Sequence, residues 1–405
     1  MPPPNNEQLL DLVFVLDCTG SMRPYIRGAE SSINEIVKAI LNAPQLTSPS
    51  SLRVGVQAYR DAIIGFVEFL TKPCPLTSNV AVVHDFLKNL NAAGGGGDGP
   101  EAVATALDRT LNDKNELGWQ PAQKGAHKII VHITDAPPHG IKEIKDNFPN
   151  GGEPDTRGMF TENILNVNKI MKAHNINYFV VSCGEMGKEY RFAVPFYRRA
   201  TRGTGYMLPL VRYDLLPKAI TALALESLDL DVALEEMKKE LGDFKKKGGP
   251  YTTSYISDVA PMHRLFMTIV TPEAANEPLT DDELQVIMDN AVTPEDLETL
   301  SKAARPKPAD AVKTIHGYFK KKGTKIRTMK TNVDYHYTGA ALHNWNIMEN
   351  AKTPADLVGG VAVPEGIPLS SDAEQSVEIV EEPITEEQIE RMAIRYKAKY
   401  GHQSD

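Results

Sequence analysis

Three oxygen-bearing side chains occupy alternate positions after an apolar run near the start of the chain. The run Leu12–Leu16 leads into Asp17. Thr19 and Ser21 follow, and Gly20 between them lets the backbone turn tightly, so the three side chains can converge. A carboxylate and two hydroxyls suit a hard cation such as Mg²⁺, which prefers oxygen ligands and keeps several waters. The alternative is a strand end followed by a capping Thr or Ser, which needs no metal.

Two later segments carry further oxygen ligands. A glycine loop at 94–97 leads to Asp98 and Glu101, at the entry of a predicted helix in which Pro100 suits the first turn. A second apolar run ends in Asp135. Because ligands bind at the carboxyl ends of strands in open α/β sheets, we expect the three segments to meet in space.

Together these motifs resemble the metal-ion-dependent adhesion site of von Willebrand factor A domains, and the resemblance covers residues 8–225. The first motif of that family is Asp-x-Ser/Thr-x-Ser, which Asp17, Thr19 and Ser21 match. The third element of the family is an Asp after a later core strand, which Asp135 matches.

The second element departs from the usual pattern. It is a Thr in most of the family, whereas this chain has Gly-Gly-Asp-x-Pro-Glu, a variant found in A domains linked to alpha-type protein kinases. Either Asp98 or Glu101 takes the place of the Thr, and we favour Asp98.

The resemblance implies a site for Mg²⁺ or Mn²⁺ in which Thr19 and Ser21 bind the ion directly, while Asp17 and Asp135 hold its waters. With few carboxylates bound directly, the ion keeps positive character, so a Glu or Asp of a partner protein can take the open position. The implied function is that of a non-enzymatic, divalent-cation-dependent adaptor or scaffold. The candidate metal-binding residues are Asp17, Thr19, Ser21, Asp98, Glu101 and Asp135.

Two alternatives stay open for the function. One is a regulatory A-domain protein associated with alpha-kinase-type signalling. The other follows from Asp17-Cys-Thr-Gly-Ser, which resembles the phosphorylated loop of haloacid-dehalogenase-like ATPases and would make Asp17 a carboxylate nucleophile. That chemistry needs a Lys beside the phosphoryl group, which no motif supplies convincingly, and it leaves Asp135 without a role.

Alternating strands and helices must position these motifs. Strands are predicted at 9–16, 52–61, 129–134, 176–182 and 205–210, with an antiparallel edge strand at 66–70. Helices are predicted at 24–41, 79–90, 101–111 and 214–241, and from 161 and 188. This order predicts a Rossmann-like, doubly wound α/β fold with a mainly parallel sheet and one antiparallel edge strand.

The remaining residues are expected to form a smaller α+β or mostly helical region. Its boundary is the Lys-Lys-Lys-Gly-Gly-Pro run at 245–250, and a strand is predicted at 264–271. Thr280, Thr293, Thr353 and Thr385 each precede an acid or Gln and predict helix starts. The predicted organisation is an A domain at 8–243, a linker at 244–260, a C-terminal domain at 261–358, an acidic flexible linker at 359–384 and a helix at 385–401.

Composition favours a cytoplasmic protein. The 405 residues carry a net charge of −9, which argues against wholesale nucleic-acid binding, and the basic run at 313–330 is interpreted as a solvated helix end. No signal peptide or membrane span is expected. The three cysteines lack metal-type pairing, and Cys18 is expected to pack beneath the site. His132 is expected in the core, and His139 in an exposed loop.

Overall fold

The computed structural model describes most of residues 9–400. Its gaps are residues 47, 62–67, 96, 112–115, 121–125, 154–159, 161–162, 185, 247–261, 272–283, 286, 289–290, 297, 299–306, 334–338 and 363–374. The chain divides into two compact units, the first from residues 1–225 and 329–379 and the second from residues 226–328 and 380–405. The predicted linker at 244–260 and the helix start at Thr280 lie largely or wholly outside the described residues.

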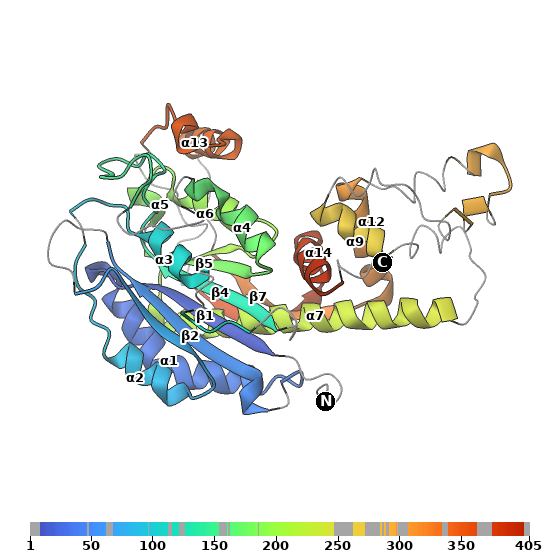
Figure 1. The fold of residues 1–405 in the computed structure, drawn as a ribbon, viewed down its shortest axis with the longest axis horizontal. Coiled ribbons are helices and arrows are strands. Elements are labelled where there is room, and N and C mark those ends of the chain that lie inside the picture. Colours follow the sequence, from blue (N-terminus) through green and yellow to red (C-terminus); the bar gives the residue numbers. More distant parts are fainter. Residues whose placement is uncertain are drawn as a thin grey trace. The chain divides into compact units, whose positions relative to one another are not determined.

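Within its described residues, the first unit contains a six-stranded sheet with the order β3-β2-β1-β4-β5-β6 (Figure 1). The strands are β1 (Leu10–Asp17), β2 (Leu52–Tyr59), β3 (Thr71–Thr77), β4 (His127–Thr134), β5 (Asn177–Cys183) and β6 (Met207–Leu210). Only β3 pairs antiparallel, with β2, and the other paired strands run parallel. The predicted α/β fold class is therefore confirmed.

Helices cover both faces of this sheet. Figure 1 shows α1 and α2 on one side and α3, α4 and α6 on the other. The bounds are α1 (Arg23–Leu41), α2 (Val80–Lys88), α3 (Val103–Leu111), α4 (Val167–Ala173), α5 (Met186–Glu189), α6 (Ala193–Thr201) and α7 (Leu216–Lys246). Short 3-10 helices are η1 (Gly20–Met22), η2 (Pro49–Ser51), η4 (Ile164–Asn166), η5 (Tyr213–Leu215) and η7 (Pro354–Asp356). Because both faces are covered, every residue of β1 is buried, as expected for a central parallel strand.

The antiparallel edge strand has the expected type but begins later than the predicted range of 66–70. It is β3, Thr71–Thr77, and it contains Pro73 and Pro75. Proline cannot donate to a strand ladder, so it is confined to edge strands and strand starts. The edge position of β3 therefore accommodates both prolines.

The second unit is helical around its own apolar core. It contains the second part of α7 together with α9 (Met262–Val270), α12 (Pro308–Lys322) and α14 (Glu386–Tyr400). The strand predicted at 264–271 is wrong, because this segment is α9. Leu265 and Phe266 are buried, and Ile269 and Val270, four residues later, pack against the same core, which is a helical spacing.

Two further elements lie in the C-terminal part. Helix α13 (Gly339–Asn350) belongs to the first unit, and β7 (Lys325–Thr331) pairs with β8 (Val377–Pro383). Strand β8 falls inside the predicted linker at 359–384, so that part of the segment is structured. Among the described residues, no helix is both long enough and apolar enough to cross a membrane.

Candidate metal centre

The carboxyl ends of three neighbouring parallel strands build the candidate site. Strand β1 lies between β2 and β4, and Asp17 is paired in register with Tyr59. Strand β4 ends at Thr134, directly before Asp135. Since parallel neighbours finish at the same edge, the turn after β1 and the loop after β4 meet there, as the sequence predicted.

Hydrogen bonds fix the carboxylate of Asp17 on both sides. Its Oδ1 accepts from the backbone N of Thr19 at 2.9 Å and from the Thr19 hydroxyl at 2.7 Å. Its Oδ2 accepts from the Thr134 hydroxyl at 2.9 Å. The hydroxyl oxygens of Thr19 and Ser21 lie 3.5 Å apart. Asp17 and Thr19 are buried while Ser21 is exposed, so the oxygen cluster is open to solvent at Ser21.

Negative charge is concentrated at this point. Burial and the nearby Asp135 raise the pKa of Asp17 to about 7, although hydrogen bonds from Thr19 and Thr134 oppose the shift. Burial also raises the pKa of Asp135, against a hydrogen bond from Ser21. Two neighbouring acids whose ionisation is opposed mainly by burial are a natural place for a cation.

Glu101 faces the same acids. Its side chain is buried, and Oε2 has no hydrogen-bond partner among the described residues. Burial raises its pKa to about 11, and the strongest charge contribution to this shift comes from Asp17, followed by Asp61, Asp135 and Asp98. The backbone N of Glu101 donates to the carbonyl of Pro137 at 2.9 Å, which ties the glycine loop to the loop after β4.

Asp98 faces different neighbours. Its Oδ2 accepts from the backbone N of Asn147 at 2.9 Å. The charges that act on its carboxyl are those of Asp61 and His139, and burial raises its pKa. Glu101 therefore feels the charges of Asp17 and Asp135 as well as those of Asp61 and Asp98, whereas neither Asp17 nor Asp135 is among the charges that act on Asp98. The choice of Asp98 over Glu101 as a metal ligand stays a prediction. The charges around the two side chains favour Glu101 instead.

Backbone conformation and close packing both constrain the glycines of this region. Gly94, Gly95 and Gly97 have positive φ angles of 83°, 128° and 79°, which glycine adopts readily. The backbone N of Gly20 donates to the carbonyl of Gly94 at 3.1 Å. A Cβ on Gly99 would stand 2.6 Å from a ring carbon of Tyr190, whose hydroxyl donates to the Gly99 carbonyl at 3.0 Å. A side chain at Gly99 would push the loop away from the site.

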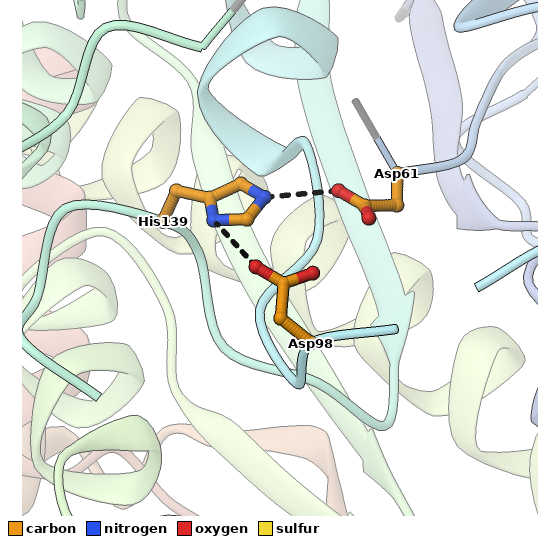
Figure 2. Close-up of side chains that lie close together, drawn as sticks. All are labelled: Asp61, Asp98 and His139. Atoms are coloured by element: carbon orange, nitrogen blue, oxygen red, sulfur yellow. Dashed lines mark hydrogen bonds and ion pairs between the residues drawn. The ribbon is translucent and has the colours of Figure 1, made fainter. Parts of the chain in front are cut away.

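His139 is the centre of an adjoining cluster, and the expectation of loop exposure is wrong. It is 1% exposed. Figure 2 shows its ring between Asp61 and Asp98, with Nε2 2.9 Å from Asp61 Oδ1. Nδ1 lies 2.7 Å from Asp146 Oδ1. Burial alone lowers its pKa, but hydrogen bonds to Asp146 and Asp61 outweigh that effect and raise the pKa to about 10.

Asp61 and Asp146 were not identified from the sequence. Asp61 follows β2, the strand beside β1, and the position of an acid just after a parallel strand was the signal that could have found it. Asp146 lies in the loop after β4, twelve residues beyond the strand end at Thr134, and no comparable pattern marks it.

The interpretations of two core residues are consistent with the structure. His132 is buried, with Nε2 2.8 Å from the Tyr59 hydroxyl and Nδ1 2.8 Å from the Tyr178 hydroxyl. Burial lowers its pKa to about 3, so it is a neutral core histidine. Cys18 is fully buried and donates to the Leu16 carbonyl.

Comparison with known proteins agrees with this geometry. A family model described as von Willebrand factor type A domain matches residues 12–138. The alpha-protein kinase vwkA of Dictyostelium discoideum is 29% identical over 181 residues, which are 42% of this chain and 25% of the kinase. A protein of Acanthamoeba polyphaga mimivirus described as ariadne-like RING finger is 30% identical over 145 residues, which are 36% of this chain and 13% of that protein.

A solved structure was also found to be similar over part of the chain. The pilus adhesin SpaC of Lactobacillus rhamnosus GG has 14% sequence identity and a TM-score of 0.40, over 56% of this chain and 30% of the adhesin. This chain therefore contains a von Willebrand factor type A domain, as its three motifs predicted. It spans about a quarter or less of the two curated relatives, so their whole-protein activities do not pass to it by similarity.

Proposed function

We propose that this protein is a divalent-cation-dependent protein-interaction module. One observation carries the proposal: the carboxylates of Asp17, Asp135 and Glu101 converge beside two hydroxyls, and Oε2 of Glu101 has no hydrogen-bond partner among the described residues. Buried polar atoms normally have a hydrogen-bond partner. A buried carboxylate oxygen that has none and faces other acids is therefore a suitable ligand for a cation.

The donor set fits Mg²⁺ or Mn²⁺. Hydroxyl and carboxylate oxygens are the ligands these hard ions prefer. Thr19 and Ser21 would bind the ion through their hydroxyls, Asp17 and Asp135 would hold its waters, and Glu101 would complete the set in preference to Asp98. When bound, the ion supplies a Lewis-acidic position that an acidic side chain can occupy.

The partner proposed is a protein that offers a Glu or Asp to the ion. Exposure of Ser21 opens the cluster to such a side chain, while burial of Asp17 and Thr19 strengthens the field that the ion would exert. We place the protein in the cytoplasm as an adaptor or scaffold. A role in alpha-kinase-type signalling is the second candidate, and it rests on the similarity to vwkA.

The contacts of Asp17 do not favour a phosphotransferase. A carboxylate nucleophile needs an oxygen free to attack phosphorus. Both oxygens of Asp17 instead accept hydrogen bonds, from Thr19 and Thr134, within a buried turn. We therefore propose a non-enzymatic role.

Asp17→Ala tests this function. The intact protein is expected to bind Mn²⁺ in calorimetry, to unfold at a higher temperature with the ion, and to capture partners from a lysate only when Mg²⁺ is present. At a hundred times Kd the ion adds about 2.7 kcal/mol to the free energy of unfolding. Asp17→Ala should lose all three effects, whereas Asp85→Asn, at an exposed position on α2, should keep them. Absence of Mn²⁺ binding by the folded intact protein would contradict the proposal.

A further inference from the structure

Three acidic side chains from separate segments surround His139. Asp61 follows β2, Asp98 belongs to the glycine loop, and Asp146 lies in the loop after β4. Their nearest carboxylate oxygens are 2.9, 3.9 and 2.7 Å from the ring nitrogens of His139. The four side chains are almost completely buried, with at most 3% of their surface exposed.

The geometry defines the charge of the ring. A carboxylate oxygen without a proton only accepts hydrogen bonds, so a ring nitrogen facing one must donate. Nε2 faces Asp61 and Nδ1 faces Asp146, so with both carboxylates ionised the two nitrogens of His139 each donate and the ring is an imidazolium. Two charge-assisted hydrogen bonds hold it in place.

The same cluster has the composition of a cation site. Ligand atoms of Asp61, Asp98 and His139 all lie within 4.8 Å of one another. Oδ1 of Asp98 has no hydrogen-bond partner among the described residues, although its side chain is 2% exposed. Figure 2 shows the Asp98 carboxyl directed toward the ring. Several carboxylates converging from different loops are typical of a hard-cation site, but the imidazolium already occupies the centre of this cluster.

We propose that His139 is a resident cation that takes the place of a second metal ion beside the metal centre. One imidazolium neutralises part of the charge of three carboxylates and joins the segments that carry them. Because the ring is covalently part of the chain, this junction exists at any ion concentration.

The resident cation also acts on the metal centre itself, and this step rests on the proposed function. Asp98 lies three residues before Glu101, and His139 lies two residues after Pro137. The contact between His139 and Asp98 and the hydrogen bond from Glu101 to Pro137 therefore join the same two loops. We assign His139 as a positioning residue that keeps Glu101 facing Asp17 without help from a second ion.

Ion counting tests the proposal. The full chain and the His139→Ala variant are titrated with Mn²⁺ alone, with free ion followed by electron paramagnetic resonance and heat by calorimetry. We expect the intact protein to bind one ion and His139→Ala to bind two, because removal of the ring leaves three carboxylates around an open position. His84→Ala, on the partly exposed face of α2, is the matched control and should keep the count of the intact protein.

The two proposals fail in different ways. If the intact protein binds no ion and His139→Ala binds one, the resident-cation proposal stands and the proposed function fails. Two ions on the intact protein would make the cluster itself a metal site and overturn the resident cation. An unchanged count in folded His139→Ala would also overturn it.

A folding defect in His139→Ala is informative as well. If the variant is unfolded without additives, circular dichroism is recorded with Ca²⁺, with Mn²⁺ and with imidazolium chloride. Refolding by imidazolium, or by a divalent ion in a variant that also carries Asp17→Ala and so lacks the metal centre, supports the proposal, since each replaces the missing positive charge. Failure of all three to restore the fold contradicts it.

Discussion

Each oxygen of the Asp17 carboxylate has an assigned partner. Thr19 occupies Oδ1 with two donors, and Thr134 occupies Oδ2 from the neighbouring strand. The carboxylate is therefore oriented before any ion arrives, which lowers the ordering cost of binding. Glu101 differs, because Oε2 has no such partner among the described residues.

Exchange of single acids for amides separates the two candidates for the third metal-binding element. Glu101→Gln should lower the affinity for Mn²⁺ by at least about tenfold, equivalent to about 1.4 kcal/mol, because Gln cannot ionise to balance an ion bound beside Asp17 and Asp135. Asp98→Asn should lower it less, since the charges acting on Asp98 come from Asp61 and His139. Calorimetry with both folded variants measures the two affinities for Mn²⁺. A larger loss in Asp98→Asn than in Glu101→Gln would assign the third metal-binding element to Asp98.

At the scale of elements, two buried glutamates in the loop after β4 cap two of the helices that cover the sheet. Glu153 accepts from the backbone N of Ala104 at 3.3 Å and of Thr105 at 2.9 Å, at the start of α3. Glu143 accepts from the backbone N of Phe192 at 2.6 Å and of Ala193 at 3.1 Å, at the start of α6. The loop thus satisfies helix-terminal donors that would otherwise be orphaned.

Glu153 should make stability depend on pH. Burial raises its pKa to about 7 from an ordinary value of 4.5. Between these values the folded state binds more protons than the unfolded state, so the stabilisation is complete below about pH 4.5 and is lost as pH rises through about 7. The free energy of unfolding of the intact protein relative to Glu153→Gln should fall over this window, by at most about 1.4 kcal/mol per pH unit.

Urea unfolding of both proteins from about pH 5 to about pH 8 checks this slope. The subtraction removes titrations common to both, including that of Glu143, whose pKa burial also raises to about 7. A difference that stays flat or increases with pH would show that Glu153 is ionised throughout.

Within the second unit, α14 is attached to α7 through a buried ion pair. Arg391 bonds to Glu226, and these side chains are 4% and 1% exposed. Arg391→Met should cost about 3–5 kcal/mol of unfolding free energy, because it leaves the Glu226 charge buried without its cation. Lys397 lies on the same helix as Arg391 but is exposed, where it contacts Thr271. Lys397→Met should change the free energy of unfolding by less than about 0.5 kcal/mol. Equal costs in denaturant unfolding would contradict this account.

The sequence predicted best where local pattern and chemistry agree. In β1 a continuous apolar run ends at Asp17, so the strand and its burial could both be predicted from it. The run at 264–271 was misassigned because a short apolar segment does not distinguish a strand from a buried helix face. The partners of His139 depend on loops that meet only after folding, as Asp61 lies 78 residues from it in sequence.

At the scale of the whole molecule, one helix passes from the first unit to the second. Helix α7 is continuous over Leu216–Lys246, and the division between the units falls after Leu225. By resemblance to A domains, in which the last helix can shift when the metal loop changes its ligands, we propose that occupancy of the metal centre is felt along α7. The alternative is that the two units act independently.

Hydrogen exchange of residues 226–246 separates these accounts. We expect amide protection in this part of α7 to change when Mn²⁺ and an acidic partner occupy the first unit. If the two ligands change the state of the helix, a change in the helix must alter their affinity by the same factor. Asp17→Ala, which should not bind the ion, is the control. Unchanged protection with occupancy shown by calorimetry would favour independent units.

The edge strands of the sheet limit how this protein can assemble. An exposed edge offers unpaired backbone groups to strands of other chains and so promotes aggregation. Here β3 carries Pro73 and Pro75, which have no N–H to offer, and β6 at the other edge has only four residues. Recruitment by strand addition, and with it edge-to-edge polymerisation of the domain, is disfavoured. A domain with such edge strands is expected to resist fibre formation through its sheet.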